Sequence, residues 1–588
     1  MTKRFYDRRL NDASRQLEEF KSKSSKLAFL RLLSFSVVLL CLILFFFDKK
    51  LFYLIASFTF FVGFIVLVIN HDKVIKKIQY YRFLIETLYE YIYRFDDRWT
   101  SFKETGIEFA NDELPFLHDL DIIGDASLFQ YLNVSKTHNG KRKLVERLSN
   151  PELTKDELQS QQQSMQEISE HIDFSLDFQV ALKIYEDEGA SLNLNYIRIH
   201  LETKIDFSKA NIYLAIVFTI VSFMTLVLAL FGKISWTYFI VICVFQLIDA
   251  LIHQYRNKEV FSDMHSIAFT IVMLERVYHV IHHATFKDER LKKLQSDIRR
   301  YGLGGIKEIN KIRAIESFNH FFVTNLLFNG LFSINIWIIY FFKKFIDRFG
   351  IHFFKSIEAL EEFEVIASLA ILGQTKQVKT LPELTSDVSL NFVDLKHPLI
   401  PEDECVSNRF QQENRINIIT GSNMSGKTSF LRMIGINIIL MNAGAYCHAE
   451  SFRSPYLKVF TSMRIKDDIS KGISTFYAEL LRIKSAIEYA EKGKPMIVFV
   501  DEIFKGTNSN DRIKGAISLI EKLNQPHIIL FISTHDFELC DIKSVKVKNY
   551  HFSEYYEGDK IKFDYTLKHG RCQTTNAKYL MKIAGIID

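Results

Sequence analysis

Proline and cysteine are scarce in this chain of 588 residues, which has 8 prolines and 6 cysteines. With 48% hydrophobic and 14% aromatic residues, the composition excludes a disordered protein. No two cysteines form a C-x-x-C pair, which argues against a disulfide framework or a zinc site and indicates a reducing compartment. The cysteines are Cys41, Cys243, Cys405, Cys447, Cys540 and Cys572.

A strong charge of either sign is also lacking. The formal net charge of +5 is mild for this length, so it permits contact with anionic lipid or nucleic acid without arguing for either. Charged residues make up 24% of the chain, too many for a bundle made only of membrane-spanning helices. We therefore expect a small membrane part joined to a large soluble part.

Four apolar runs are long enough to cross a membrane, since a spanning helix needs about 20 residues. They are Leu32–Phe47, Leu51–Asn70, Asn211–Phe231 and Ile234–Ile252. The links Asp48–Lys50 and Gly232–Lys233 are so short that they predict two tight helical hairpins. Lysines and arginines flank the first hairpin on both sides, which predicts cytoplasmic flanks. The alternative is that these runs are core helices of a soluble domain, an alternative favoured most in the fourth run by Gln246 and Asp249.

The stretch "IITGSNMSGKTSF", Ile418–Phe430, has the spacing G-x-x-x-x-G-K-T. A β-branched run precedes the glycines and a helix-like segment follows, so backbone N–H groups and a helix N-terminus can surround phosphates. We expect Lys427 at the β- and γ-phosphates of ATP and the Thr428 hydroxyl on Mg²⁺. The residues predicted to bind ATP here are Gly421, Ser422, Asn423, Met424, Ser425, Gly426, Lys427, Thr428 and Ser429.

Two further apolar segments end in polar residues. The predicted strand Ile497–Val500 is followed by Asp501 and Glu502, and "HIILFISTHDFEL" contains a strand that ends near His535. The first carboxylate can hold the water shell of Mg²⁺, and the second can polarise the attacking water. A histidine at the third strand end can sense the γ-phosphate. Three polar strand ends at one sheet edge predict nucleotide chemistry.

A fifth apolar run, Phe321–Phe342, carries Asn325, Asn329 and Asn335, which are costly in lipid without partners. Two hairpins return the chain to the cytoplasm, and one more crossing would place the nucleotide loop outside the cell. We therefore predict that this run is a buried or membrane-skimming helix.

Four stretches, "TGSNMSGKTSFLRMIG", "DDISKGISTFYAEL", "DEIFKGTNSND" and "STHDFEL", resemble the ABC-type ATPase domain of the MutS family of DNA mismatch-repair proteins. Upstream, Glu361–Ala370 and Asp394–Ile400 resemble the approach to that domain. Leu120–Ser169 resembles the start of the MutS core domain.

The resemblance implies a homodimer with a shared site. Ser474 would approach the γ-phosphate bound by the other subunit, after the pair Asp467 and Asp468, and Asn423 would contact phosphate or the dimer loop. His551, with Asn549, would pack against adenine. The loop crossing the dimer interface would contain Gly506, Thr507, Asn508 and Asp511.

The chain also departs from the family pattern. Ser425 and Arg512 stand where the family usually has glycine, and Cys405 and Val406 at the apolar pair beside adenine predict weaker base stacking. The triplet Phe102–Glu104 mimics the wedge of mismatch readers, but the α/β domain that carries the wedge is not visible. Nor do we see the helical C-terminal extension that helps MutS proteins to dimerise. We expect mostly non-specific contact with duplex DNA.

The predicted fold is multidomain, with α-helical membrane hairpins and a helical core and lever region before an α/β ABC-type P-loop ATPase domain. The predicted segments are a basic segment and first hairpin (1–100), a core-like helical region (101–209), the second hairpin (210–252), a lever-like helical region (253–380) and the ATPase domain (381–588). Such a protein would be integral to the inner (cytoplasmic) membrane, with its ATPase domain in the cytoplasm.

Two functions fit these features. The first is a membrane-anchored MutS-like ATPase that hydrolyses ATP in a composite dimer site and binds DNA mostly through phosphates. The second is an ABC-like mechanochemical membrane protein whose ATP-driven dimerisation acts on a membrane or protein partner without DNA. The sequence leaves both open.

Overall fold

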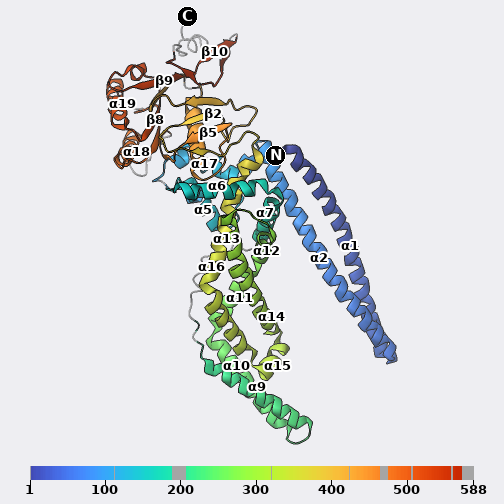
Figure 1. Cartoon of the computed structure of the whole chain (residues 1–588). Helices are drawn as coiled ribbons and strands as arrows, with labels where there is room; N and C mark the ends of the chain where they lie inside the picture. Colours follow the sequence, from blue (N-terminus) through green and yellow to red (C-terminus); the bar gives the residue numbers. More distant parts are fainter. Residues whose placement is uncertain are drawn as a thin grey trace. The chain divides into compact units, whose positions relative to one another are not determined.

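The structure is a computed structural model, and its contacts divide the chain into two compact units. One contains Met1–Ser135, Asn139–Ser175 and Glu364–Asp588, and the other contains Lys136–His138 and Leu176–Phe363. The described residues are 2–111, 113–187, 205, 207–319, 321–422, 424–463, 475–504, 508–557 and 560–572. The N-terminal part is mostly helical and the C-terminal part mixes helices with sheets (Figure 1). The five predicted segments stay a prediction.

Two long helices, α1 (Lys3–Asp48) and α2 (Leu51–Phe95), form the first hairpin and pack side by side along their length. Lys49 closes α1 in the left-handed conformation, with φ 50°, and its N–H bonds back to the Phe45 carbonyl. The basic N-terminal residues continue the same helix as the first apolar run, because no helix-breaking residue separates them.

A six-stranded sheet organises the C-terminal part, in the order β12-β9-β4-β8-β7-β6. All neighbouring pairs are parallel except β12 with β9. The strands are β4 (Ile416–Thr420), β6 (Lys458–Ser462), β7 (Met496–Asp501), β8 (Ile528–Thr534), β9 (Val547–His551) and β12 (Lys568–His569). The predicted strands before the glycine loop, before Asp501 and before His535 are therefore confirmed as neighbours.

Smaller sheets flank this one. A four-stranded sheet has the order β1-β5-β2-β3, and β10 pairs with β11 in a hairpin. Their bounds are β1 (Glu383–Leu384), β5 (Ser451–Ser454), β2 (Asn391–Leu395), β3 (Asn408–Gln411), β10 (Glu554–Glu557) and β11 (Lys560–Phe563). Phe410 of β3 packs on Phe531 of β8, so the four-stranded sheet covers one face of the larger sheet.

Helices cover the six-stranded sheet. Alternate residues of β4, β7 and β8, such as Ile418, Val498 and Leu530, form one buried cluster with residues of two helices on the same face. Those helices are α18 (Thr475–Ala490) and α19 (Ser509–Leu523), while α17 (Lys427–Asn442) follows the glycine loop.

Short helices precede the sheets, and Thr154 caps one of them with a complete capping box. They are α3 (Phe116–Asp119), α4 (Leu128–Leu132), α5 (His138–Leu148) and α6 (Lys155–Glu170). Three helices, α5, α7 (Ile172–Asp187) and α16 (Ile334–Thr375), have residues in both units.

All the regular elements among the described residues of the second unit are helices. Its helices are α9 (Lys209–Leu230), α10 (Trp236–Arg256), α11 (Lys258–Met273), α12 (Glu275–His283), α13 (Glu289–Asp297), a π-helical turn (Ile298–Leu303), α14 (Gly304–Glu316) and α15 (Phe322–Phe332). Helices α9, α10 and α15 pack against one another.

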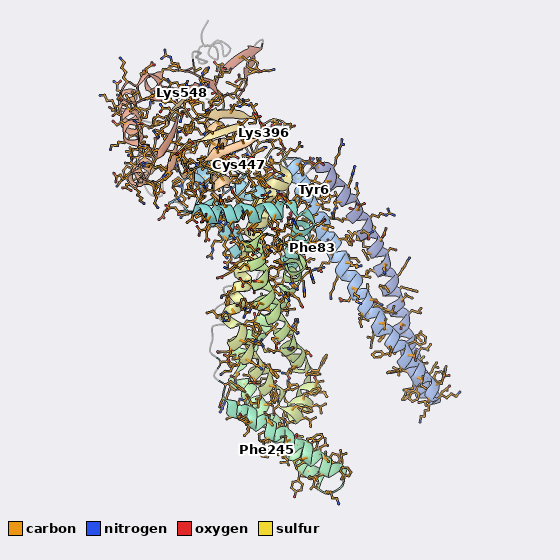
Figure 2. All side chains as sticks on the ribbon, viewed as in Figure 1. Tyr6, Phe83, Phe245, Lys396, Cys447 and Lys548 are labelled. Atoms are coloured by element: carbon orange, nitrogen blue, oxygen red, sulfur yellow. The ribbon has the colours of Figure 1, made fainter. Side chains whose placement is uncertain are left out.

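Four helices, α1, α2, α9 and α10, are long and apolar enough to cross a membrane, in agreement with the predicted runs. Only 6–17% of each apolar window is buried inside the protein. Figure 2 shows Phe245 projecting from α10, and its side chain is 62% exposed. Most of the apolar surface of these four helices is therefore exposed in the described protein.

The fifth run was predicted to be one buried or membrane-skimming helix, and the prediction of a single helix is wrong because the run forms two. Contact of this run with a membrane stays a prediction. The chain bends by 81° between α15 and α16 at Ser333, whose φ is 49°. The carboxamide of Asn329 accepts the N–H of Asn335 at 2.9 Å and so caps the first turn of α16. Phe322 at the start of α15 is 79% exposed, so the run is not buried along its length.

Candidate nucleotide site

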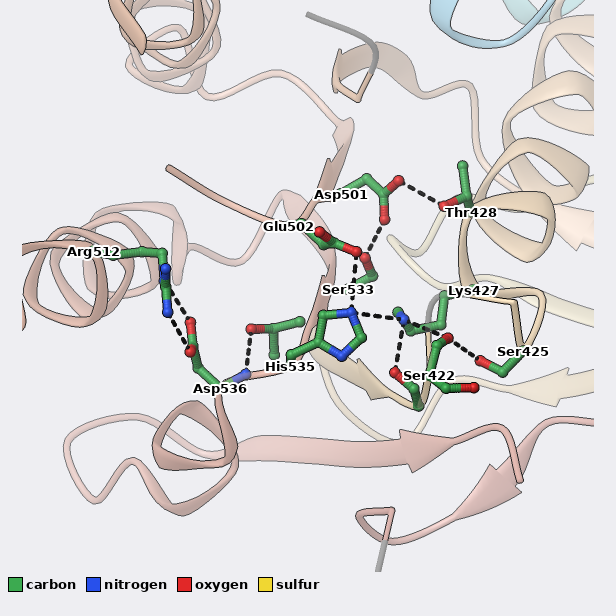
Figure 3. Close-up of polar contacts among 12 residues, drawn as sticks. Ser422, Ser425, Lys427, Thr428, Asp501, Glu502, Arg512, Ser533, His535 and Asp536 are labelled. Carbon is green, nitrogen blue, oxygen red and sulfur yellow. Dashed lines mark hydrogen bonds and ion pairs between the residues drawn. The ribbon is translucent and has the colours of Figure 1, made fainter. Parts of the chain in front are cut away.

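Three neighbouring parallel strands bring the predicted site residues to one sheet edge. Thr420 at the end of β4 pairs with Thr534 of β8, and Asp501 at the end of β7 pairs with Ser533. The carboxyl ends of β4, β8 and β7 therefore lie together, and the glycine loop, Asp501 and His535 follow directly from them (Figure 3). Ligands of parallel α/β sheets bind at such an edge.

The glycine loop depends on its glycines. Gly426 has φ +98°, a left-handed conformation that favours glycine, and a Cβ there would lie 2.9 Å from the ring of Tyr565. A Cβ on Gly421 would lie 2.7 Å from the Ser425 hydroxyl and 2.9 Å from the Phe552 carbonyl. Ser425, where the resembled family usually has glycine, fits because its hydroxyl donates to the Ser422 carbonyl at 2.8 Å.

Lys427 begins α17 and is 3% exposed. Its ammonium donates to the carbonyls of Gly421 and Ser422 at 2.7 and 2.8 Å and lies 3.4 Å from Nε2 of His535. Carbonyl acceptors of the loop hold the ammonium beside the loop's own backbone. A phosphate bound in the loop would meet a cation that is already in position.

Thr428 and Asp501 form a hydroxyl–carboxylate pair. The Thr428 hydroxyl donates to one oxygen of Asp501 at 2.7 Å, and the Ser533 hydroxyl donates to the other. Hydroxyl and carboxylate oxygens are the ligands that Mg²⁺ prefers. Among the described residues, no group of three or more His, Cys, Asp or Glu side chains has metal-binding geometry, so any Mg²⁺ here would need oxygens from the nucleotide and water.

Glu502 has an unusual backbone. Its φ is 55°, and its N–H donates to the Ser533 carbonyl at 3.0 Å, which turns the side chain back over the sheet edge. One carboxylate oxygen lies 3.1 Å from Nε2 of His535. A non-glycine residue in this conformation costs about 1–3 kcal/mol and is concentrated at functional sites. Glu502 and His535 thus sit together at the open end of the glycine loop.

The buried Glu479 of α18 supports this turn and was missed from the sequence. Its carboxylate accepts the N–H of Phe504 at 2.7 Å, two residues after Glu502, and Phe504 has φ 56°. Glu479 is 3% exposed. A glutamate on the apolar side of the stretch "TFYAEL" was the available signal.

Arg512, the second departure from the family pattern, has a structural partner. Its guanidinium donates two hydrogen bonds, of 2.9 and 2.8 Å, to the carboxylate of Asp536 (Figure 3). Asp536 directly follows His535, so this bidentate pair ties the start of α19 to the histidine strand end.

The predicted adenine-side residues have other partners. Asn549 donates to the Cys540 carbonyl at 2.9 Å, and Nδ1 of His551 lies 3.1 Å from the Gly570 carbonyl. Burial raises the pKa of the Cys405 thiol, whose sulfur accepts the His397 N–H, and the neighbouring Val406 is 38% exposed. Tyr565, against Gly426 and 45% exposed, is a further aromatic group at this end.

The remaining predicted residues are either exposed, placed at the start of α19, or outside the described residues. Met424 is 74% exposed and Ser429 is also exposed. Asn508 caps α19 by accepting the Asn510 N–H, and Asp511 lies in that helix's first turn. The predicted residues outside the described ranges are Asn423, Asp467, Asp468, Ser474, Gly506 and Thr507.

Comparison with known proteins agrees with this geometry. The family described as MutS domain V matches residues 417–588. The DNA mismatch repair protein MutS of Aquifex pyrophilus is 32% identical over 252 residues, which are 41% of this chain and 28% of that protein. The MutS proteins of Orientia tsutsugamushi (strain Boryong) and Staphylococcus carnosus (strain TM300) are each 31% identical, over 35% and 40% of this chain and 24% and 28% of their own length.

The match thus spans about a quarter of the length of these curated relatives. It supports membership of the MutS family for the C-terminal part of the chain. The matched range includes the glycine loop, Asp501, Glu502 and His535, whereas Cys405 and Val406 lie before it.

Proposed function

We propose that the chain is a membrane-anchored ATPase of MutS type, which binds Mg²⁺-ATP at the edge of β4, β8 and β7 and hydrolyses it. The observation that carries the proposal is the group of Lys427, Thr428, Asp501, Glu502 and His535 at three adjacent strand ends. Bound Mg²⁺-ATP would supply the phosphoanhydride bond that is cleaved.

Each side chain has a role that follows from its position. The loop N–H groups and Lys427 would hold the phosphates, and Thr428 with Asp501 would hold Mg²⁺. Glu502 would orient and polarise a water, while His535, hydrogen-bonded to Glu502 at 3.1 Å and near Lys427, would sense the γ-phosphate. The contacts of Lys427 with the Gly421 and Ser422 carbonyls fit this ligand, because they hold the ammonium beside the loop that would surround the phosphates.

Loss of Lys427 tests nucleotide binding directly. Lys427→Ala should abolish Mg²⁺-dependent ATP hydrolysis and weaken binding of a fluorescent ATP analogue. Ser429→Ala, at an exposed neighbour on the same helix, should leave both nearly unchanged. Equal activity in the two variants would remove the glycine loop from the mechanism.

We further propose that hydrolysis needs two chains. The γ-phosphate end of the site is open to solvent at His535, whose side chain is 44% exposed. By the resemblance, Ser474 of a partner subunit would close it. Mixing Lys427→Ala with Ser474→Ala subunits should restore activity, since each heterodimer keeps one intact composite site. If heterodimers form and stay inactive, the shared site is wrong.

We propose that α1, α2, α9 and α10 span the cytoplasmic membrane and leave both flanks of each hairpin in the cytoplasm. Their exposed apolar faces and the basic residues at the open ends of the hairpins support this topology. Single cysteines placed at Asp48 and Lys233, in the two hairpin turns, should react with a membrane-impermeant reagent from outside intact cells. A cysteine at Lys494 should not react unless the cells are opened.

The object of the ATPase is proposed to be duplex DNA, bound mostly through phosphates. The relatives are named as DNA mismatch repair proteins, which supports this choice. The detergent-solubilised protein should bind homoduplex, mismatched and branched DNA with similar, strongly salt-dependent affinity. No binding at low salt would favour the second candidate, a mechanochemical protein that acts on a membrane or protein partner, which the four exposed apolar helices also support.

A further inference from the structure

A cavity of about 420 Å³ lies between α14 and α16, in the helical unit, whereas the nucleotide site belongs to the other unit. Three basic side chains, Lys311, Lys344 and Arg348, line it. Its apolar lining comes from Phe341, Phe345, Phe349, Ile312 and Ile315. The volume is within the range of small-molecule sites.

The two helices run antiparallel along the cavity. Gly304 lies against Phe349, and Gly305 lies against Phe353 and Phe345. Residues late in α14 therefore face residues early in α16. One end of the cavity is made by Ile315 and Phe341, whereas the basic side chains, together with Glu308, occupy the middle and the other end. The cavity is apolar at one end and carries its charges towards the other.

The contacts of Lys343 show where the cavity lies along the proposed membrane spans. Its ammonium donates to the carbonyls of Ile205 and Phe207 at 2.9 and 3.3 Å, immediately before α9 begins. Phe207 also packs against His253, one turn before α10 ends. Lys343, and with it Lys344, therefore stands where both helices of the second hairpin meet the water boundary.

The charges of the cavity are not balanced. Glu308 is the acid among the lining residues, and its carboxylate is 2.9 Å from the ammonium of Lys311. The side chains of Lys344 and Arg348 are exposed, and the Arg348 guanidinium lies 5.2 Å from the centre of the Phe349 ring. Two positive charges on an apolar wall are complementary to an anion that carries an apolar tail.

We propose that this cavity binds the headgroup of an anionic phospholipid from the cytoplasmic leaflet, with its phosphate between Lys311, Lys344 and Arg348. The acyl chains would leave past Ile315 and Phe341 towards Phe318 and Phe332, which are 40% and 45% exposed. Basic pockets beside spanning helices on the cytoplasmic side recognise such headgroups. The inference rests on the proposed membrane topology.

Tryptophan fluorescence offers a local reporter. Trp337 stacks on Phe341 at 5.9 Å between ring centres, at the apolar end of the cavity. Trp236, 49% exposed at the start of α10, reports membrane contact far from the cavity along the same span, and Trp99 is buried. The full chain would be placed in phosphatidylcholine vesicles with a small fraction of brominated phosphatidylglycerol or brominated phosphatidylcholine. The quenching that is lost in a Trp337→Phe variant, relative to the natural chain, is the contribution of Trp337.

Brominated phosphatidylglycerol should quench Trp337 several times more than brominated phosphatidylcholine, whereas both lipids should quench Trp236 equally. The triple variant Lys311→Gln, Lys344→Gln, Arg348→Gln should lose this preference. Each charge removed should lower the affinity for phosphatidylglycerol by about fivefold. Arg348→Lys keeps the charge and should keep most of the preference. Arg313→Gln, on another face of α14, should not change it.

Three results would overturn the proposal, and they are distinguishable. Equal quenching of Trp337 by the two lipids, with Trp236 quenched, would remove the lipid site and leave the membrane topology standing. No quenching of Trp236 by either lipid would remove the proposed spans and the lipid site together. Full relief of the Trp337 quenching by duplex DNA would make the cavity a nucleic-acid site instead.

Discussion

Apolar side chains have opposite surroundings in the six-stranded sheet and in the second hairpin. Ile497 of β7 and Phe531 of β8 are completely buried, whereas Val217 and Phe223 of α9 are 56% and 65% exposed. The residue types are similar, so composition alone does not separate the two regions. The difference is the partner: the six-stranded sheet is covered by helices and by the four-stranded sheet of its own chain, whereas much of the apolar surface of α9 has no such cover.

The strongest test of this contrast introduces the same charge in both regions. Val498→Asp in the sheet should cost more than about 4 kcal/mol and unfold the ATPase part, because an unpaired carboxylate would be buried. Ile220→Asp, on the exposed face of α9, should leave thermal unfolding of that part unchanged and lower membrane insertion by about 2.5–3.5 kcal/mol. Thermal unfolding and carbonate extraction of membranes measure the two effects. Equal unfolding by both variants would contradict the contrast.

The second largest loss of stability is expected when a buried charge of the sheet region, Asp119, is removed. Asp119 of α3 is fully buried, and its carboxylate accepts from the Thr461 hydroxyl, the Met463 N–H and Arg482 at 2.7, 3.2 and 3.0 Å. Asp119→Ala leaves the Arg482 guanidinium without this partner and should cost about 3–5 kcal/mol in chemical denaturation.

The exposed Asp125 provides the matched control, and Asp125→Ala should change stability by less than about 0.5 kcal/mol. If the two alanine variants are equally stable, Asp119 does not hold β6 and α18 to the preceding helices.

The glycine loop should respond less strongly. Gly426→Ala places a Cβ at φ +98° against Tyr565 and should weaken ATP-analogue binding by about 1–2 kcal/mol. Gly493→Ala has similar backbone strain at φ +68° but meets nothing within 4 Å. It should lower stability by a similar amount with no loss of nucleotide affinity. Loss of affinity in both variants would show that the Gly426 effect is not local.

The smallest effect concerns pH. Burial lowers the pKa of His397 from 6.5 to about 3, so the folded protein keeps this side chain neutral where the unfolded chain would bind a proton. The stability of the folded state that depends on a neutral His397 is fully present above pH 6.5 and is lost as the pH falls towards 3. Between pH 7.5 and 6 the free energy of unfolding should fall by about 0.8 kcal/mol from this group. His397→Asn should flatten that slope, and an unchanged slope would exclude His397 as its source.

The nucleotide edge could be predicted because its signals are local. The glycine loop and the polar residues after β7 and β8 follow directly from apolar runs, and parallel strands place such ends together. The role of Asp119 could not be predicted, because its partners lie more than 340 residues along the chain. The partner of Arg512 required the spatial position of Asp536.

In the hairpin region too, local signals could be predicted from the sequence and contacts between separate elements could not. Run length predicted α9 and α10, but not the 81° bend at Ser333, because that serine sits inside one continuous apolar run. The bend depends on the Asn329 side chain, which bonds to the next helix six residues away. A hydropathy profile does not show which polar side chain forms a hydrogen bond with the backbone.

Replacement of Glu502 tests the central claim most directly. Glu502→Gln keeps the size of the side chain and the supports of the loop but removes the carboxylate proposed to polarise water. In the full chain in phosphatidylcholine vesicles, ATP turnover should fall by at least about 100-fold, and Mg²⁺-ATP binding should be retained. Turnover equal to that of the natural chain, with binding intact, would contradict an ATPase site at this edge of the sheet.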